Sequence, residues 1–296
     1  MREADLPAVL LVDKPEGPTS HDVIQVARSA LGVKRIGHTG TLDPFASGLL
    51  ILCVGRSTRL AEYFHLLPKS YSATAILGVE TDTEDRTGKV AATSDDWRSV
   101  TRQDIETAAG RLRGEYEQVP PAFSAKKVAG RRSYQAARAG ESIELEARTV
   151  CVHALEIGDV RLPEVEFVAQ VSTGTYVRSV ARDLGTHLGC GAHLSSLRRL
   201  SIGPFSVSDA VDIADLAKAA IPAYSSLSAA QSLSWLPTRS LSGTEVVEVE
   251  HGRQIPDPAG DDRTDLPVAM VAGERLVAVG RRDSEALRPE KVFHDA

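Results

Sequence analysis

The chain has few cysteines, and their positions exclude two common kinds of site. Cys53, Cys151 and Cys190 are an odd number, lie far apart and form no C-x-x-C pair. No histidine spacing beside them is typical of a metal site. We therefore expect buried thiols in a reducing compartment, and neither a disulfide framework nor a metal centre.

Signals for export and for membrane insertion are missing as well. The first residues, MREADLP, lack a positive start followed by an apolar run, and no later apolar stretch could span a bilayer. We expect a soluble cytoplasmic protein. Its 296 residues, of which 42% are hydrophobic, can bury a core and indicate one large and one small domain.

A net positive charge, which is usual in proteins that bind nucleic acid, is also absent. The formal net charge is −6, whereas phosphate binding depends on Lys and Arg. Averages hide patches, however, because basic residues gather at 126–138 and at 198–199, and acidic ones at 257–265. A basic face on an acidic protein is therefore compatible with the sequence.

Hydrophobic patterning predicts a mixed α+β architecture without internal repeats. Ser20 is expected to cap a helix that Gly32 ends, and Thr101 with Asp104 resembles a capping box. The expected strands are 8–15, 49–55, 70–78 and 164–172, and the expected helices are 20–31, 57–66, 101–112 and 175–189. The segment TDTEDRTG (81–88) is expected to be a hairpin connection.

A stretch rich in Ser, Pro and small residues, 221–243, indicates a domain boundary. We place a large domain at 1–237 and a small β-rich module at 238–296. Strands of the module are expected at EVVEVE (245–250), PVAMVAG (267–273) and RLVAVGR (275–281). The basic stretch 120–141 has no long apolar stripe and is expected to be an exposed excursion.

One loop concentrates chemically active groups. Residues 37–44, GHTGTLDP, hold an imidazole, two hydroxyls and a carboxylate, with glycines that permit close approach of a ligand. Simpler explanations are a turn that begins at Asp43 and a histidine, His38, that is merely a satisfied polar residue. A nucleotide-binding P-loop is disfavoured because the Gly-Lys-Ser/Thr ending is missing.

Longer blocks in a fixed order carry a family resemblance. They are VDKPEGPTSHDV (12–23), GHTGTLDPFASGLL (37–50), LG (77–78) with TDTED (81–85), PAFSAKK (121–127), GTYVR (174–178) and GCGAHL (189–194). Over residues 8–210 the chain closely resembles the TruB family of bacterial tRNA pseudouridine-55 synthases. The resemblance implies an α+β, pseudouridine-synthase-type fold, with a mixed, mainly antiparallel sheet, flanking helices and a small β-rich, PUA-like C-terminal module.

The resemblance implies that Asp43 is the essential carboxylate. Pseudouridine formation breaks the C1′–N1 bond of a flipped-out uridine, lets the uracil turn, and joins C1′ to C5. A carboxylate can attack C1′ or assist loss of the C2′ proton to give a glycal, and the sequence does not choose between the two. Because the reaction is an isomerisation, we expect no cofactor and no metal.

Three further site residues follow from the same resemblance. Arg178 is expected to pair with Asp43 through its planar guanidinium. Tyr71 is expected to stack on the flipped base and to accept a proton, and Tyr176 to make a second substrate contact. Without the family, core packing would explain either tyrosine, and a surface position would explain Arg178.

The resemblance also implies that His38 enters the T-loop near the vacated base position and that Leu197 lies beside the bound uracil. Leu197 alone would be assigned to the core. Asp85 follows the TDT block, where ordering of the pocket wall, an RNA contact and a turn cap explain it equally well. We leave Asp85 outside the catalytic set.

The basic excursion, extended to 120–148, resembles the segment that closes over the T-loop in this family. Candidate RNA contacts are Arg59, Lys126, Lys127, Arg131 and Arg132. The chain departs from the family at Ser57-Thr58-Arg59, where Ala-Thr-Lys is common, and in the acidic insert 255–267, which would repel phosphate. The expected partner is tRNA, through its T-loop and T-stem, with no membrane and no obligate protein partner.

Two other functions remain as alternatives. One is a tRNA-folding chaperone whose pocket only opens and refolds the RNA. The other is a pseudouridine synthase that acts on ribosomal or guide-bound RNA, which is disfavoured because no extended tail for such an assembly is evident in the sequence.

Overall fold

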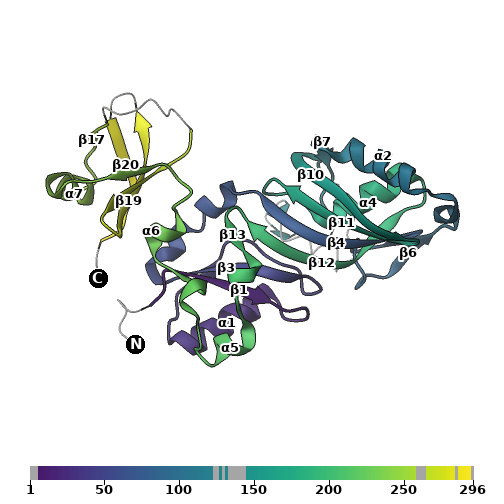
Figure 1. The fold of residues 1–296 in the computed structure, drawn as a ribbon, viewed down its shortest axis with the longest axis horizontal. Coiled ribbons are helices and arrows are strands. Elements are labelled where there is room, and N and C mark those ends of the chain that lie inside the picture. Colours follow the sequence, from purple (N-terminus) through teal and green to yellow (C-terminus); the bar gives the residue numbers. More distant parts are fainter. Residues whose placement is uncertain are drawn as a thin grey trace.

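The computed structural model describes residues 6–122, 127–128, 131–132, 145–257, 265–283 and 286–294, with the backbone alone at 127–128 and 131–132. Figure 1 shows an elongated molecule in which a large α+β body carries a small module at one end. The module holds the C-terminal strands.

The body is built on one eleven-stranded sheet, ordered β14-β1-β3-β12-β4-β11-β10-β7, with β2, β13 and β15 at its margins. Most neighbours are antiparallel, but β1 with β14 and β12 with β3 are parallel. The strands are β1 (Val9–Lys14), β2 (Ile36–His38), β3 (Ser47–Val54), β4 (Lys69–Leu77), β7 (Gly114–Gln118), β10 (Arg148–Arg161), β11 (Glu164–Val171), β12 (Ala192–Ile202), β13 (Phe205–Ser206), β14 (Val211–Asp212) and β15 (Ser226–Leu227). The predicted mixed, mainly antiparallel sheet is confirmed.

Helices cover the sheet at both of its ends (Figure 1). α1 (Ser20–Leu31) packs on the face of β1 and β3 that carries Leu10, Val12 and Leu50. α2 (Arg102–Leu112) and α4 (Val177–Leu188) pack together over alanines and Phe167 of β4 and β11. The shorter helices are α5 (Ile213–Ala217) and α6 (Ala229–Ser232), with 3-10 turns η2 (Gly55–Leu60), η3 (Tyr63–Leu66), η4 (Asp96–Ser99), η5 (Val207–Asp209) and η6 (Ala223–Ser225).

Two hairpins lie outside the main sheet. They are β5 (Val79–Thr81) with β6 (Val90–Thr93), and β8 (Lys127–Val128) with β9 (Arg131–Arg132). The first confirms the predicted connection at 81–88. The predicted helix at 57–66 is instead the two 3-10 turns η2 and η3, which are separated at Ala61 and Glu62.

The C-terminal module is a five-stranded sheet, ordered β16-β18-β19-β20-β17. Its elements are β16 (Thr238–Ser240), α7 (Gly243–Glu250), β17 (Ile255–Pro256), β18 (Val268–Ala272), β19 (Arg275–Asp283) and β20 (Ala286–Val292). This is the expected β-rich, PUA-like module, and it begins close to residue 238, although the boundary at 237 stays a prediction. The strand predicted at EVVEVE is wrong, because Ser242 and Glu245 form a capping box that starts a helix there.

The module packs directly on the body. Ala269, Leu276 and Val279 of the module share one apolar cluster with residues of the opposite face of β1 and β3 and with Phe64 of η3. Arg59 donates a hydrogen bond to the Val292 carbonyl at 2.8 Å, and its guanidinium lies 5.1 Å from the Phe293 ring centroid. Val292 and Phe293, near the last described residue, therefore contact η2.

Candidate active site

The loop that carries Asp43 is held by backbone hydrogen bonds on both sides. The N–H of Thr39 donates to the Ile51 carbonyl at 3.1 Å, and the N–H of Ala46 donates to the Asp43 carbonyl at 3.1 Å. The second bond closes a β-turn in which Pro44 follows Asp43, an order that such turns favour. The predicted turn and the predicted functional loop are thus the same structure.

A second turn, at residues 15–18, supports this loop from β1. The fully buried Lys14 donates to the carbonyls of Pro15 and Pro18 at 2.9 and 2.8 Å. The N–H of Gly17 in turn donates to the Pro44 carbonyl at 2.8 Å. Burial lowers the pKa of Lys14 to about 8, while the nearby Asp43 carboxylate raises it.

Ser20 has a different role from the predicted one. Thr19, not Ser20, is the N-cap of α1 and forms a capping box with Asp22. The hydroxyl of Ser20 instead accepts from the N–H of Leu42 at 2.9 Å and donates to the Leu42 carbonyl at 3.0 Å. The Ser20 hydroxyl thus satisfies both backbone polar groups of Leu42, so α1 holds the residue before Asp43 in place.

Arg178 lies at the start of α4 and pairs with Asp43. Its Nε is 3.0 Å from Asp43 Oδ2, while its Nη1 donates to the Thr83 carbonyl at 2.7 Å and is 3.6 Å from Asp85 Oδ2. Arg178 is only 4% exposed. Contacts on both sides of the guanidinium therefore aim it at Asp43, as the resemblance implied.

Asp85 combines two of the roles considered for it. Its Oδ1 accepts from the hydroxyls of Thr83 and Thr87 at 2.9 and 2.6 Å and from the N–H of Thr87 at 2.9 Å. These bonds make the turn between β5 and β6, while Oδ2 faces Arg178. Asp85 is thus a turn residue that also positions Arg178.

Opposing influences set the pKa of Asp43. Burial raises it above its ordinary value, the charge of Arg178 lowers it, and the carboxylate of Asp85 raises it again. The charge of Arg178 therefore opposes the effect that burial has on the pKa of the Asp43 carboxyl.

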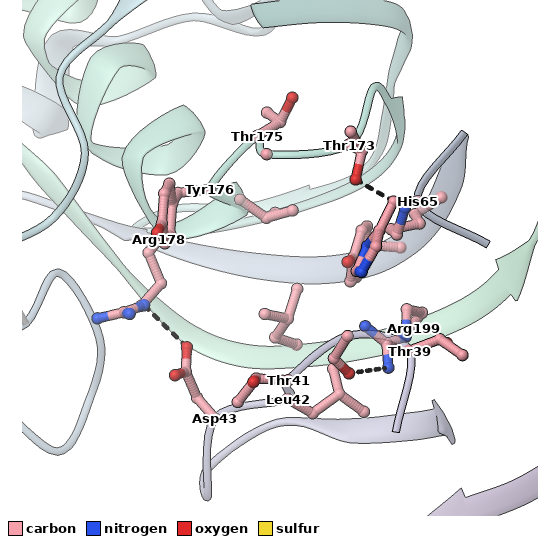
Figure 2. Close-up of a pocket in the computed structure, with 16 residues that line it drawn as sticks. Thr39, Thr41, Leu42, Asp43, His65, Thr173, Thr175, Tyr176, Arg178 and Arg199 are labelled. Carbon is pink, nitrogen blue, oxygen red and sulfur yellow. Dashed lines mark hydrogen bonds and ion pairs between the residues drawn. The ribbon is translucent and has the colours of Figure 1, made fainter. Parts of the chain in front are cut away.

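A cavity of about 390 Å³ lies beside Asp43, within the roughly 300–1,000 Å³ range of small-molecule sites. Of the residues assigned from the sequence, it brings together Asp43, Tyr71, Tyr176, Arg178 and Leu197. Figure 2 shows Asp43 and Arg178 at one end of this cavity, and His65, Thr173 and Arg199 at the other. The remaining lining residues are Thr39, Gly40, Thr41, Leu42, Lys69, Gly174, Thr175 and Val177.

Other predicted residues lie elsewhere or outside the description. His38 is on β2, is partly buried and is not among the lining residues; its Nδ1 has no hydrogen-bond partner among the described residues. Arg59 contacts the C-terminal segment. Lys126 lies outside the described residues, and Lys127, Arg131 and Arg132 are described by backbone alone. Most of the excursion 120–148 is therefore not described.

Sequence reasoning missed Lys69 and Arg199, which both line the cavity. A signal for them existed, because side chains two residues apart on a strand share a face. Lys69 is two residues before Tyr71 on β4, and Arg199 is two residues after Leu197 on β12. Gly48 permits this arrangement, since a Cβ there would lie 2.2 Å from the Arg199 carbonyl oxygen.

In the described part of the chain, no group of three or more His, Cys, Asp or Glu side chains is placed to hold a metal ion. Cys53, Cys151 and Cys190 are free thiols. The same residues contain no helix that is both long and apolar enough to cross a membrane.

Comparisons with known proteins agree with this geometry. Residues 28–177 match the model of the TruB family pseudouridylate synthase N-terminal domain, and residues 178–234 match the tRNA pseudouridylate synthase B C-terminal domain. The second match ends before the five-stranded sheet.

Proteins named tRNA pseudouridine synthase B are similar over nearly the whole chain. The one from Geobacter sulfurreducens is 39% identical over 96% of this chain and 99% of its own. The one from Thermobifida fusca is 41% identical over 96% and 98%, and the one from Mycobacterium tuberculosis is 38% identical over 98% and 97%.

Among solved structures, a Cbf5–Nop10–Gar1 complex matches with a TM-score of 0.75 and 26% identity, over 97% of this chain and 84% of that one. An H/ACA RNP bound to a substrate RNA containing 2′-deoxyuridine matches with a TM-score of 0.73 and 26% identity, over 97% and 85%. Because the family model matches residues 28–177 and the relatives match nearly the whole chain, the chain belongs to the TruB family of pseudouridylate synthases.

Proposed function

We propose that the protein converts the uridine at position 55 of the tRNA T-loop into pseudouridine, with Asp43 as its catalytic carboxylate. The observation that carries this proposal is the Asp43–Arg178 pair, 3.0 Å long, at one end of a cavity that Tyr71 and Leu197 also line. Family membership and relatives named tRNA pseudouridine synthase B support the reaction and the RNA class.

Asp43 acts on the ribose of a flipped-out uridine. Its carboxylate either attacks C1′ or assists loss of the C2′ proton, and in both routes the C1′–N1 bond breaks. The uracil then turns and its C5 bonds to C1′, as C1′ leaves the Asp43 oxygen in the first route or C2′ regains its proton in the second. C5 loses its proton and N1 takes one up, so the composition is unchanged. Arg178 holds the carboxylate ionised and aimed through these steps.

Tyr71 and Leu197 form the walls between which the base turns. Tyr71 is 8% exposed and Leu197 6% exposed, and they lie on the adjacent strands β4 and β12. Stacking on an aromatic ring offsets part of the energy lost when a base leaves its neighbours. The Tyr71 hydroxyl is the proposed acceptor of the C5 proton.

The RNA is gripped from the side of Tyr176. Its N–H donates to Gln118 Oε1 at 2.8 Å, and Gln118 Nε2 donates to the Tyr176 carbonyl at 3.2 Å. Gln118 ends β7, which leads into residues 120–148. A second cavity of about 410 Å³ shares Tyr176 and contains Pro120 and Arg148, so both ends of the proposed clamping segment begin beside the active site.

We place the interaction on the T-loop and T-stem and propose that the chain works without an obligate protein partner, in the cytoplasm where its tRNA substrate is found. Similarity over nearly the whole length to bacterial proteins named tRNA pseudouridine synthase B supports the choice of tRNA.

The test is release of tritium from tRNA labelled at uridine C5, with wild type compared with Asp43→Asn. Wild type is expected to release tritium from intact tRNA, and Asp43→Asn to release none while it still binds the RNA. A tRNA with cytidine in place of the T-loop uridine is the substrate control.

Normal turnover by Asp43→Asn would refute the catalytic role of that carboxylate. An absence of release from every tRNA, with folded wild-type protein that improves tRNA refolding, would favour the chaperone function instead. Release from a different RNA alone would redirect the substrate assignment.

A further inference from the structure

The active-site cavity has two ends of opposite character. Asp43 is the only carboxylate among its lining residues, all of which are described, and it is paired with Arg178. The other end, here called the cationic end, contains His65, Lys69 and Arg199. Figure 2 shows the cationic end on the far side of the cavity from Asp43.

Lys69 and Arg199 are almost completely removed from solvent, with exposures of 7% and 1%. Among the described residues, neither has a carboxylate at ion-pair distance. Lys69 Nζ donates to the Leu67 carbonyl at 2.9 Å and to the Thr173 hydroxyl at 3.2 Å. Arg199 donates through Nε to the Leu49 carbonyl at 2.6 Å and through Nη2 to the Gly40 carbonyl at 3.1 Å.

These bonds leave donors available toward the cavity. An ammonium group has three N–H donors and a guanidinium has five, and each cation uses two in bonds to neutral described groups. Buried charges without a counter-charge are costly. The cost appears in Lys69, where burial, followed by the charge of Arg199, lowers the pKa to about 8.

The surroundings do not neutralise this charge. Burial and then Lys69 lower the pKa of His65, which Glu62 alone raises. Glu62 is itself ion-paired with Lys291 of the C-terminal segment. Burial and the charge of Arg199 also lower the pKa of the nearby His38. The cationic end thus has a positive charge that no described carboxylate balances.

We propose that the cationic end binds a backbone phosphate of the RNA that flanks the flipped uridine, with Lys69 and Arg199 as its main donors. The inference rests on the proposed function, because a nucleotide whose ribose lies at Asp43 carries a phosphodiester on each side. A phosphate held opposite Asp43 fixes the ribose between two charged anchors, and it supplies the counter-charge that the two cations lack.

The test pairs loss of the protein's charge with loss of the RNA's charge. T-arm stem-loop RNAs carry one neutral methylphosphonate linkage at a time, on either side of the target uridine. The same 2′-deoxy sugars are present in every RNA, including the fully charged reference, to prevent strand cleavage by a 2′-hydroxyl at the neutral linkage. The measurement is the dissociation constant at one fixed salt concentration.

Neutralising one of the two flanking linkages is expected to weaken binding to wild type about tenfold. The same neutral linkage is expected to weaken binding to Lys69→Met by less than about twofold, because the contact is already gone. Lys69→Arg, which keeps the charge, should retain the tenfold effect. Lys69 is chosen because Arg199 also holds the Gly40 and Leu49 backbone.

Two controls separate charge from structure. Thr173→Val removes the hydrogen bond to Lys69 but keeps the ammonium, so the tenfold effect should persist. Lys218→Met removes an exposed lysine of the α5 end that pairs with Asp215, and it should also retain the effect. Lys69→Gln, which keeps a donor, replaces Lys69→Met if that variant does not fold.

A full tenfold loss in Lys69→Met at the sensitive linkage, or no loss in wild type at either flanking linkage, would overturn the phosphate assignment. Tritium release from the unmodified T-arm by wild type is measured in parallel. Release without the coupling refutes only the phosphate site, whereas no release refutes the proposed function.

Discussion

Ser20 and Leu42, 22 residues apart in the sequence, are joined by two hydrogen bonds through one hydroxyl. Ser20 Oγ accepts from the Leu42 N–H at 2.9 Å and donates to its carbonyl at 3.0 Å. Leu42 is 3% exposed and directly precedes Asp43. The position of the proposed catalytic carboxylate therefore depends on a side chain from helix α1.

Ser20→Ala is expected to impair both folding and catalysis. It leaves the buried N–H and carbonyl of Leu42 without partners, which costs about 1–3 kcal/mol of unfolding free energy. Displacement of Asp43 should lower kcat by about tenfold to a hundredfold. Denaturant unfolding and tritium release measure the two effects.

Thr19→Ala is the matched control for that variant. It removes the capping box of α1 and should lower the free energy of unfolding. The kcat should be unchanged, because the Thr19 side chain forms hydrogen bonds with Asp22 and not with the loop that carries Asp43. Equal kcat values for the two variants would show that Ser20 does not position Asp43.

The pH dependence of kcat/KM should report the charge balance around Asp43. Burial raises the pKa of Asp43 above its ordinary value of 3.8, and the active form is the carboxylate. Activity is therefore present above the folded-state pKa and is lost as the pH falls through it. Arg178→Met removes the charge that lowers this pKa, so the acid limb of the profile should move to higher pH.

Asp85→Asn should move the same acid limb in the opposite direction. The Asp85 carboxylate raises the pKa of Asp43, and asparagine keeps an Oδ1 that can accept the bonds from Thr83 and Thr87. A shift of both variants in one direction would contradict the assigned charge balance, since it would indicate a general loss of structure.

Tyr71→Phe and Tyr71→Leu should separate stacking from proton transfer. Phenylalanine keeps the ring, so RNA affinity should remain near that of wild type while kcat falls by about 10²–10⁴-fold if the hydroxyl accepts the C5 proton. Leucine loses the ring as well and should weaken binding by a further ~1–3 kcal/mol. A kcat for Tyr71→Phe close to that of wild type would assign Tyr71 to stacking alone.

Arg59 is expected to act mainly within the protein. Its guanidinium lies 5.1 Å from the Phe293 ring centroid and donates to the Val292 carbonyl. A double-mutant cycle of Arg59→Met and Phe293→Ala should give a coupling free energy of ~0.5–1 kcal/mol in unfolding. The salt dependence of tRNA binding should be the same in Arg59→Met and wild type, and a shallower slope would instead support the RNA contact predicted from the sequence.

Patterns local to the chain predicted much of the fold. The alternation in EVEFVAQVS corresponds to β11, and the capping box at Thr101 and Asp104 starts α2. Alternation failed at EVVEVE, because the valines and glutamates also suit a helix once Ser242 and Glu245 cap it. In short segments of this kind, the capping residues at the ends decide between helix and strand as much as the hydrophobic period does.

The order of motifs determined the family, and with it Asp43, Arg178, Tyr71, Tyr176 and Leu197 as candidates, because these residues lie within or beside recognisable blocks of sequence. It did not identify the phosphate-facing pair. Lys69 and Arg199, 130 positions apart, become neighbours only because β4 pairs with β12, where Arg199 lies opposite Tyr71.

The sequence by itself therefore determined the reaction family, the candidate carboxylate and most of the strands, since these depend on residue types at short spacing. Only the tertiary structure decided that Ser20 holds Leu42, that Asp85 positions Arg178, and that two cations without a carboxylate partner among the described residues share one end of the cavity. The physical reason is that hydrogen bonds and charge interactions act over a few ångströms of space, whatever the separation along the chain.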